Sequence, residues 1–241
     1  MSRKVKAYDN REFLASKNAR ALRILAEYLE PQSRFLEHGI EDTIVFFGSA
    51  RLKEGNRWYE AARKLAFRLT EWSKALPTRE RRFVVCSGGG PGIMEAASRG
   101  ASEAKGLNIG LGISLPHEQH DNPYLTRELG FHFHYFFMRK FWFAYLAKAV
   151  VVFPGGYGTL DELMEITTLV QTRKMTKPMP IVLFGGDYWD EVVDFEAMAR
   201  HGTISPEDIG IVRRIDSVDE AFEWITAELA RHAMDKPGAG L

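Results

Sequence analysis

Three charged residues and three glycine-rich segments of this sequence have the residue types and spacing of a catalytic or ligand-binding site. Arg139 and Lys140 are adjacent in "FFMRKFW", and Glu162 closes the run "VVVFPGGYGTLDE". An arginine can bind a phosphate or a carboxylate through two parallel hydrogen bonds, and a lysine adds a point charge. A carboxylate can orient or deprotonate water. These residue types therefore suit the hydrolysis of an anionic substrate.

The three glycine-rich segments each follow a predicted strand. They are "FFGSAR" at 46–51, "VVCSGGGPG" at 84–92 and "VVVFPGGYGT" at 150–159. Glycine lets the backbone approach a ligand closely, and the helix that follows presents unpaired N–H groups with a positive dipole end. Two such turns facing one crevice would form an anion site, most naturally for phosphate. The alternative is that the glycines only make tight turns between strands and helices.

Two familiar nucleotide motifs are absent from the sequence. "GGGPGI" and "GYGTLD" both lack the third glycine of G-x-G-x-x-G, so a dinucleotide site is weakly supported. No G-x-x-x-x-G-K-[ST] segment is present, which argues against a Walker-type nucleotidase. A mononucleotide or a sugar phosphate is left as the better ligand class.

The spacing of Thr159 and Glu162 also has a purely structural interpretation. Thr159-Leu160-Asp161-Glu162 fits a capping box, in which each side chain accepts from the backbone N–H of the other residue. By spacing alone, this interpretation is favoured. In the functional interpretation, Glu162 points into the crevice and the first N–H groups of the helix are left for a phosphate. The second glycine-rich turn and the Arg-Lys pair lead us to predict the functional arrangement.

The elements that must position these residues alternate between apolar strands and amphipathic helices. This pattern predicts an α/β fold with a doubly wound, mainly parallel Rossmann-like sheet and helices on both faces. We expect one nucleotide-binding domain over 1–241, with a helical extension at 1–40 and a loose tail at 235–241. Helices are predicted at 11–30 (ended by Pro31), 56–76, 93–106, 159–174, 188–200 and 217–232, with Ser217 as the cap of the last.

Composition and charge exclude several classes of function. Lys plus Arg and Asp plus Glu both number 32, so non-specific nucleic-acid binding is disfavoured. The single cysteine, Cys86, excludes an intramolecular disulfide and a cysteine-based zinc site. His132 and His134 alternate on one strand, but no third ligand at diagnostic spacing supports a metal. With no signal peptide and no apolar run of about 20 residues, we expect a cytoplasmic protein that does not bind membranes.

Taken together, these segments resemble a known family. "PGGYGTLDE" matches the P-G-G-x-G-T-x-x-E motif of the Lonely Guy proteins, cytokinin riboside 5′-monophosphate phosphoribohydrolases that were often mislabelled lysine decarboxylases. "SGGGPGIMEAASRGA", "GISLPHEQ" and the Arg-Lys pair follow in family order, over roughly residues 40 to 200. "FFMRK", "GIMEAA" and the N-terminal helix look like the longer bacterial branch, which leaves the preferred base open between a cytokinin and adenine.

The resemblance implies hydrolysis of the N-glycosidic bond of a nucleoside 5′-monophosphate to free base and ribose 5-phosphate. It implies no cofactor, no metal and a homo-oligomer, either a dimer or a larger assembly. A non-catalytic nucleotide-binding or carrier protein on the same scaffold is the alternative. Arg139 and Glu162 match the catalytic residues of the family. The expected substrate-binding residues are Ser49, Gly88, Gly89, Gly90, Glu95, Glu118, Lys140, Gly155, Gly156, Gly158 and Thr159.

Overall fold

Seven parallel strands form the central sheet of the computed structural model, which describes residues 5–113 and 122–238. Their spatial order is β4-β3-β2-β1-β5-β6-β7, and every neighbouring pair is parallel. The predicted parallel, doubly wound sheet is confirmed. The strands are β1 (Thr43–Phe47), β2 (Val84–Ser87), β3 (Asn108–Ile113), β4 (Gly130–Phe133), β5 (Ala147–Val152), β6 (Ile181–Phe184) and β7 (Arg213–Ile215).

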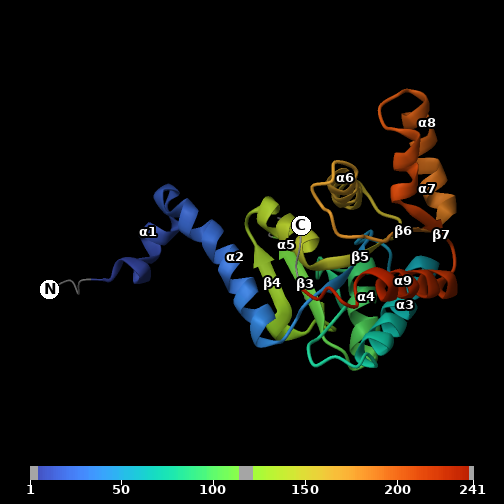
Figure 1. Ribbon diagram of the computed structural model, residues 1–241. Coiled ribbons are helices and arrows are strands. Elements are labelled where there is room, and N and C mark those ends of the chain that lie inside the picture. The colour runs from blue at the N-terminus through green and yellow to red at the C-terminus, as the bar shows by residue number, and fades with distance from the viewer. Residues whose placement is uncertain (1–4, 114–121, 239–241) are drawn as a thin grey trace.

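Helices cover both faces of this sheet (Figure 1). One face packs against α3 (Arg57–Lys74), α4 (Ile93–Glu103) and α9 (Val218–His232). The other packs against α2 (Arg20–Glu37), α5 (Phe136–Leu146), α6 (Tyr157–Gln171), α7 (Gly186–Val192) and α8 (Phe195–Arg200). Strands buried on both sides favour apolar residues at most positions, because successive side chains point to opposite faces.

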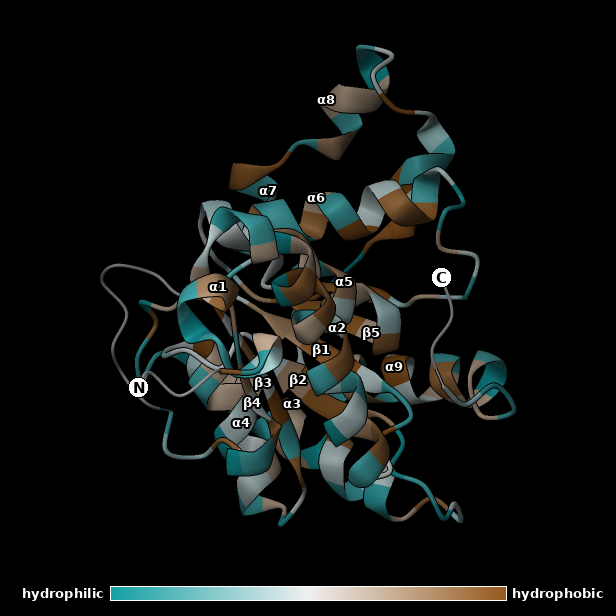
Figure 2. Cartoon of the chain, turned by 90° about the vertical axis from the view of Figure 1, so that its left-hand side faces the viewer, coloured by the Kyte–Doolittle hydropathy of each residue, from teal (hydrophilic) through white to brown (hydrophobic). Residues whose placement is uncertain are grey.

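Strand β1 shows this alternation directly. Ile44 and Phe46 belong to the core under α3 and α4, whereas Val45 and Phe47 belong to the core under α5 and α6. All five residues of β1 are buried. Figure 2 shows hydrophobic residues gathered along the strands and on the helix surfaces that face them.

The order of the strands reverses between β1 and β5. From β1 the chain moves outward through β2, β3 and β4, and it then returns to the other side of β1 to add β5, β6 and β7. In an open α/β sheet, such a switch point leaves a crevice at the carboxyl ends of the two central strands. The turns "FGSAR" and "FPGGYG" lie there, because they directly follow β1 and β5.

The N-terminal helical segment differs from the prediction in two ways. The expected helix at 11–30 is divided into α1 (Arg11–Ala15) and α2, and α2 continues past Pro31 to Glu37. A proline inside a helix removes the hydrogen bond to the carbonyl four residues earlier. That carbonyl belongs to Glu27, and it accepts instead from the indole Nε1 of Trp142 at 3.0 Å. Trp142 therefore replaces the backbone donor that Pro31 lacks, and the helix continues past the proline.

Helix α2 packs against the core through a face that does not carry its leucines. This packed face consists of Ile24, Tyr28, Pro31 and Phe35, whereas the leucines of α2 are exposed. Figure 1 shows α1 and the first part of α2 projecting from the rest of the molecule. The exposed leucines of α2 are Leu22, Leu25, Leu29 and Leu36.

The segment at 188–200 forms two helices instead of the single one expected. Helix α7 ends at Val192, and Asp194 caps the start of α8 by accepting from the N–H of Ala197 at 2.7 Å. The predicted cap of α9 is confirmed, since Ser217 accepts from the N–H of Glu220 at 3.1 Å. Among the described residues, no helix has the length and hydropathy needed to cross a membrane.

Candidate active site

A cleft of about 700 Å³ lies at the switch point of the sheet. Four elements of the predicted site line it: the turn after β1, the turn after β5, the start of α5 and the start of α6. Apolar side chains form the remaining wall. The lining residues are Phe47, Gly48, Ser49, Ala50, Arg51, Gly88, Met94, Ile113, Phe136, Arg139, Gly155, Gly156, Tyr157, Gly158, Thr159, Leu160, Asp161, Glu162 and Tyr188.

The three glycine-containing turns are joined by backbone hydrogen bonds. The N–H of Ser49 donates to the carbonyl of Pro154 at 3.0 Å, and the N–H of Ile93 donates to the carbonyl of Ser49 at 3.0 Å. Gly92 has φ +69°, and a Cβ there would lie 2.3 Å from the carbonyl oxygen of Ser49. Only glycine fits this contact. The turns after β1, β2 and β5 are therefore one connected structure at one end of the sheet.

Helix α6 begins two residues before the expected cap. Gly156 is its N-cap, and it has no side chain that could accept a hydrogen bond from the first turn. Thr159 is thus the third residue of the helix, where it cannot cap, and the capping-box interpretation of Thr159 and Glu162 is wrong. The first N–H groups of α6 open onto the cleft, because Gly156, Tyr157 and Gly158 all line it.

Glu162 points towards Arg139, as the functional interpretation predicts. Its carboxylate Oε1 lies 3.9 Å from Nη1 of Arg139, and its side chain is 8% exposed. Burial raises the pKa of Glu162 to about 7, although the charges of Arg139 and Lys140 lower it in part. Near neutral pH the carboxyl group therefore exchanges a proton readily, as a general acid or base must.

Arg139 is held in the first turn of α5. Its Nε donates to the carbonyl of Leu111 at 2.8 Å, and its guanidinium lies over the ring of Phe143, 5.1 Å from the centroid. A Cβ on Gly88 would lie 2.8 Å from Nη2 of Arg139, so the glycine turn after β2 leaves room for this side chain. A cation at the positive end of a helix is stabilised by a bound anion.

Of the expected substrate-binding residues, Ser49, Gly88, Gly155, Gly156, Gly158 and Thr159 line the cleft, whereas four other described candidates do not. Lys140 pairs with Asp161 at 2.8 Å and with Glu165 at 2.7 Å, and it is not among the lining residues of the described chain. Glu95 accepts from the hydroxyl of Tyr59 at 2.8 Å and likewise does not line the cleft. Gly89 and Gly90 lie one and two residues beyond the lining residue Gly88, and Glu118 falls outside the described residues.

The apolar wall and Tyr188 are parts of the site that the sequence patterns did not identify. Tyr188 follows a fourth strand that ends in glycines, "LFGGDYW", so the signal used for the other turns was present here too. The apolar wall carries no such signal, because its residues come from several distant elements. It comprises Phe47, Met94, Ile113, Phe136 and Leu160.

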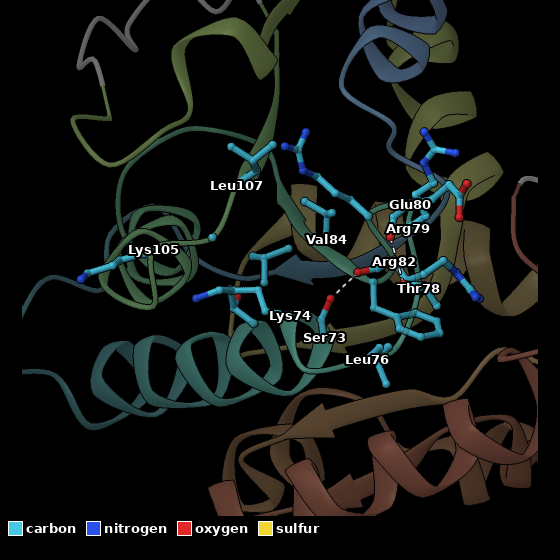
Figure 3. Close-up of a pocket in the computed structure, with 15 residues that line it drawn as sticks. Ser73, Lys74, Leu76, Thr78, Arg79, Glu80, Arg82, Val84, Lys105 and Leu107 are labelled. Atoms are coloured by element: carbon cyan, nitrogen blue, oxygen red, sulfur yellow. Dashed lines mark hydrogen bonds between the residues drawn. The ribbon is translucent and has the colours of Figure 1, made fainter.

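A second cavity, of about 350 Å³, lies at the opposite end of the sheet (Figure 3). Lys74, Arg79, Arg81, Arg82 and Lys105 line it, which at first suggests an anion site. However, it adjoins the carboxyl ends of α3 and α4, where the helix dipole favours cations and disfavours anions. Lys74 already donates to the carbonyl of Ala104 at the end of α4, at 2.6 Å. Arg81 and Arg82 likewise donate to carbonyls at the ends of α2 and α9. Three of these cations therefore bind helix ends, and we assign no ligand to this cavity.

No cluster of three or more His, Cys, Asp or Glu side chains suited to a metal occurs in the described part of the chain.

Known proteins similar to this chain include a family defined by a sequence model and two curated plant enzymes. A family model described as "possible lysine decarboxylase" matches residues 94–225. The cytokinin riboside 5′-monophosphate phosphoribohydrolase LOG7 of Arabidopsis thaliana is 33% identical over 108 residues, which cover 41% of this chain and 50% of that protein. LOG1 of the same plant, described with the same activity, is 32% identical over 95 residues that cover 39% of this chain and 44% of that protein. The match thus spans half or less of the length of these curated relatives.

Similar solved structures support the fold. The molybdenum cofactor binding protein of the phototrophic bacterium Rippkaea orientalis has a TM-score of 0.53 and 19% identity, with 78% of this chain and 98% of that chain covered. At this identity, the likeness concerns the arrangement of strands and helices alone.

Proposed function

This chain belongs to the family described as possible lysine decarboxylases, and on that premise we propose that it is an N-glycosidase acting on nucleoside 5′-monophosphates. The products are a free base and ribose 5-phosphate. The named activity of the LOG relatives supports this reaction, and cytokinin riboside monophosphate and AMP are the substrates we propose.

One observation carries the proposal: a buried carboxyl group with a pKa of about 7 faces an arginine across a cleft built from glycine turns. Glu162 and Arg139 come from different helices and meet at 3.9 Å. A carboxyl group of this kind is poised for proton transfer at neutral pH, and perturbed pKa values of this kind gather at active sites. The glycine turns and the start of α6 supply N–H groups for the substrate phosphate.

In the proposed mechanism, Arg139 and the first turn of α6 bind the phosphate and fix the position of the ribose. This fixed geometry places the anomeric carbon beside Glu162. As the bond to the base breaks, positive charge develops on the sugar, and the ionised carboxylate of Glu162 stabilises it. Glu162 then accepts a proton from the water that attacks the anomeric carbon. The leaving base takes up a proton from solvent water, which balances the proton that Glu162 accepts from the attacking water.

The residues of the cleft do not suit the decarboxylase chemistry in the family description. A pyridoxal phosphate enzyme needs a lysine that forms a Schiff base with the cofactor. No lysine is among the described residues that line the cleft, and Lys140 nearby is paired with two carboxylates. This mismatch favours the phosphoribohydrolase over a lysine decarboxylase.

The test is to incubate the purified protein with AMP and with isopentenyladenosine monophosphate and to separate the products by chromatography. We expect free base and ribose 5-phosphate in equal amounts from at least one substrate. Tight binding of both nucleotides with no release of base would contradict the proposal and would indicate the carrier alternative instead. Free lysine, incubated in parallel with pyridoxal phosphate, should give no cadaverine.

A further inference from the structure

The structure assigns to Tyr188 the positioning of the phosphate-binding loop at 154–158, an inference that rests on the proposed function. Tyr188 lies on α7, after β6, in the strand-helix unit next to the one that carries the loop. Its hydroxyl donates to the carbonyl of Gly155 at 2.6 Å, and its side chain lines the cleft. It is a positioning residue, because it acts on the substrate through the backbone of this loop.

The ring of Tyr188 is itself held in place by two tryptophans. It packs edge-to-face against Trp58, at 6.2 Å and 70°, and against Trp189, at 5.1 Å and 83°. Trp189 is fully buried, and its indole Nε1 donates to the carbonyl of Phe184 at 3.1 Å. An ion pair between Arg57 and Asp187 ties α7 to α3. The packing of its ring against Trp58 and Trp189 therefore fixes the direction in which Tyr188 presents its hydroxyl.

The hydrogen bond to the carbonyl of Gly155 also fixes the direction of the N–H of Gly156. A trans peptide is planar, with its C=O and N–H pointing in opposite directions. The structure has no cis peptide among the described residues, so the N–H of Gly156 points away from Tyr188 when the carbonyl of Gly155 points towards it. Gly156 is also the N-cap of α6. The tyrosine thus sets the direction of an N–H at the start of the helix.

A second contact holds the preceding carbonyl in the same way. The N–H of Ser49 donates to the carbonyl of Pro154 at 3.0 Å. Two successive carbonyls of the loop are therefore bound by donors from two other elements. Carbonyl oxygens repel a phosphate, whereas backbone N–H groups attract it. By holding the carbonyls, Ser49 and Tyr188 leave the N–H groups for the anion.

The contacts of Tyr188 predict that removal of its hydroxyl lowers the affinity for the substrate. In Tyr188→Phe the ring still packs against Trp58 and Trp189, so the fold is kept, but the carbonyl of Gly155 loses its donor. That peptide can then rotate, and the loop binds phosphate less well. The reacting atoms are not touched, so the loss falls on substrate affinity.

The experiment compares Tyr188→Phe with Tyr28→Phe, a matched loss of a phenol hydroxyl on α2, outside the cleft lining. We expect the KM for AMP and the calorimetric Kd of AMP to rise about 3- to 10-fold in Tyr188→Phe, the range for one lost hydrogen bond. We expect kcat to change less than about twofold, and Tyr28→Phe to match the wild type. Adenosine, which lacks the phosphate, should bind both variants alike.

Equal AMP affinity in the two variants would overturn the inference, and so would a loss of affinity that is the same for AMP and adenosine. Failure of the proposed function gives a different result. If the wild type releases no base, the calorimetric comparison with AMP still shows whether Tyr188 controls phosphate binding. A wild type that does not bind AMP at all contradicts both.

Discussion

The two ends of the sheet both bury charged side chains, but they use them differently. At the amino ends of the strands, Asp42 and Arg82 are bonded to each other at 2.7 Å and are almost completely buried. At the carboxyl ends, Glu162 and Arg139 face each other at 3.9 Å across the edge of a cleft. The two pairs differ in what surrounds them.

At the amino end, protein groups satisfy the charges. Asp42 also accepts from the N–H of Phe83 at 2.6 Å, and Arg82 donates to the carbonyls of Ala233 and Met234 at 2.7 and 3.0 Å. This network ties the start of β1 and the start of β2 to the end of α9. Removing one partner of such a buried pair is strongly destabilising, because the other charge is left buried and uncompensated.

At the carboxyl end, the charges face space that a substrate can fill. Glu162 is almost as deeply buried, and burial raises the pKa of its carboxyl group to about 7, as burial also raises the pKa of Asp42. A buried carboxyl group with a raised pKa therefore does not by itself mark a site. Glu162 differs from Asp42 because it lies beside a cleft, whereas Arg82 and the N–H of Phe83 donate to Asp42.

The largest effect is expected when the charge of Glu162, at the carboxyl ends of the strands, is removed. In Glu162→Gln we expect kcat for AMP hydrolysis to fall by about 100- to 10,000-fold, the usual contribution of a general base. AMP should still bind, because Arg139 and the loop remain. Glu223→Gln, at an exposed position of α9, is the control and should keep full activity. Equal rates in the two variants would remove Glu162 from the mechanism.

Breaking the amino-end pair should have the opposite result. Asp42→Ala leaves Arg82 buried without its carboxylate, so we expect a loss of about 3–5 kcal/mol in the free energy of unfolding by urea. The folded fraction should keep the kcat of the wild type. Asp219→Ala, which removes an exposed partner of Arg68, should change stability by less than about 0.5 kcal/mol. If Asp42→Ala is as stable as this control, the amino-end pair is not structural.

The same Glu162→Gln variant should be more stable than the wild type at high pH. A carboxyl group whose pKa is raised in the folded state contributes stability below its unfolded pKa of about 4.5, and loses that contribution as pH rises through 7. At pH 8 the wild type holds a buried charge that glutamine lacks. We expect Glu162→Gln to gain about 1–3 kcal/mol over the wild type in urea unfolding at pH 8.

Repeating the measurement at pH 5 supplies the control for this stability gain. Glu162 is then protonated in the folded protein, and the difference between the two proteins should shrink. A difference that is the same at both pH values would show that the titration of Glu162 does not cause it.

The pH dependence of the reaction should follow the ionisation of Glu162. Because the base must be ionised, kcat/KM for AMP should rise about tenfold from pH 6 to pH 8, with a midpoint near 7. The measurement is an initial-rate profile at constant ionic strength. A midpoint near 4.5, the ordinary pKa of a glutamate, would contradict the environment described for Glu162.

The sequence predicted the parts of this protein that depend on neighbouring residues. Apolar runs gave the strands, alternation with amphipathic helices gave the doubly wound sheet, and Ser217 marked the start of α9. The glycine turns, Arg139 and Glu162 could be found as candidates because turn chemistry and residue type are local properties. Parallel topology then brought most of these candidates to one edge of the sheet.

Only the tertiary structure decided how each candidate is used. The start of α6 at Tyr157 excludes the capping box, Trp142 allows α2 to continue through Pro31, and Lys140 is paired with carboxylates on α6. Tyr188 reaches the loop of Gly155 from a different strand-helix unit. Each of these contacts joins residues that are distant in the chain. Spacing and propensity describe interactions over a few residues, so packing alone settles which distant groups meet.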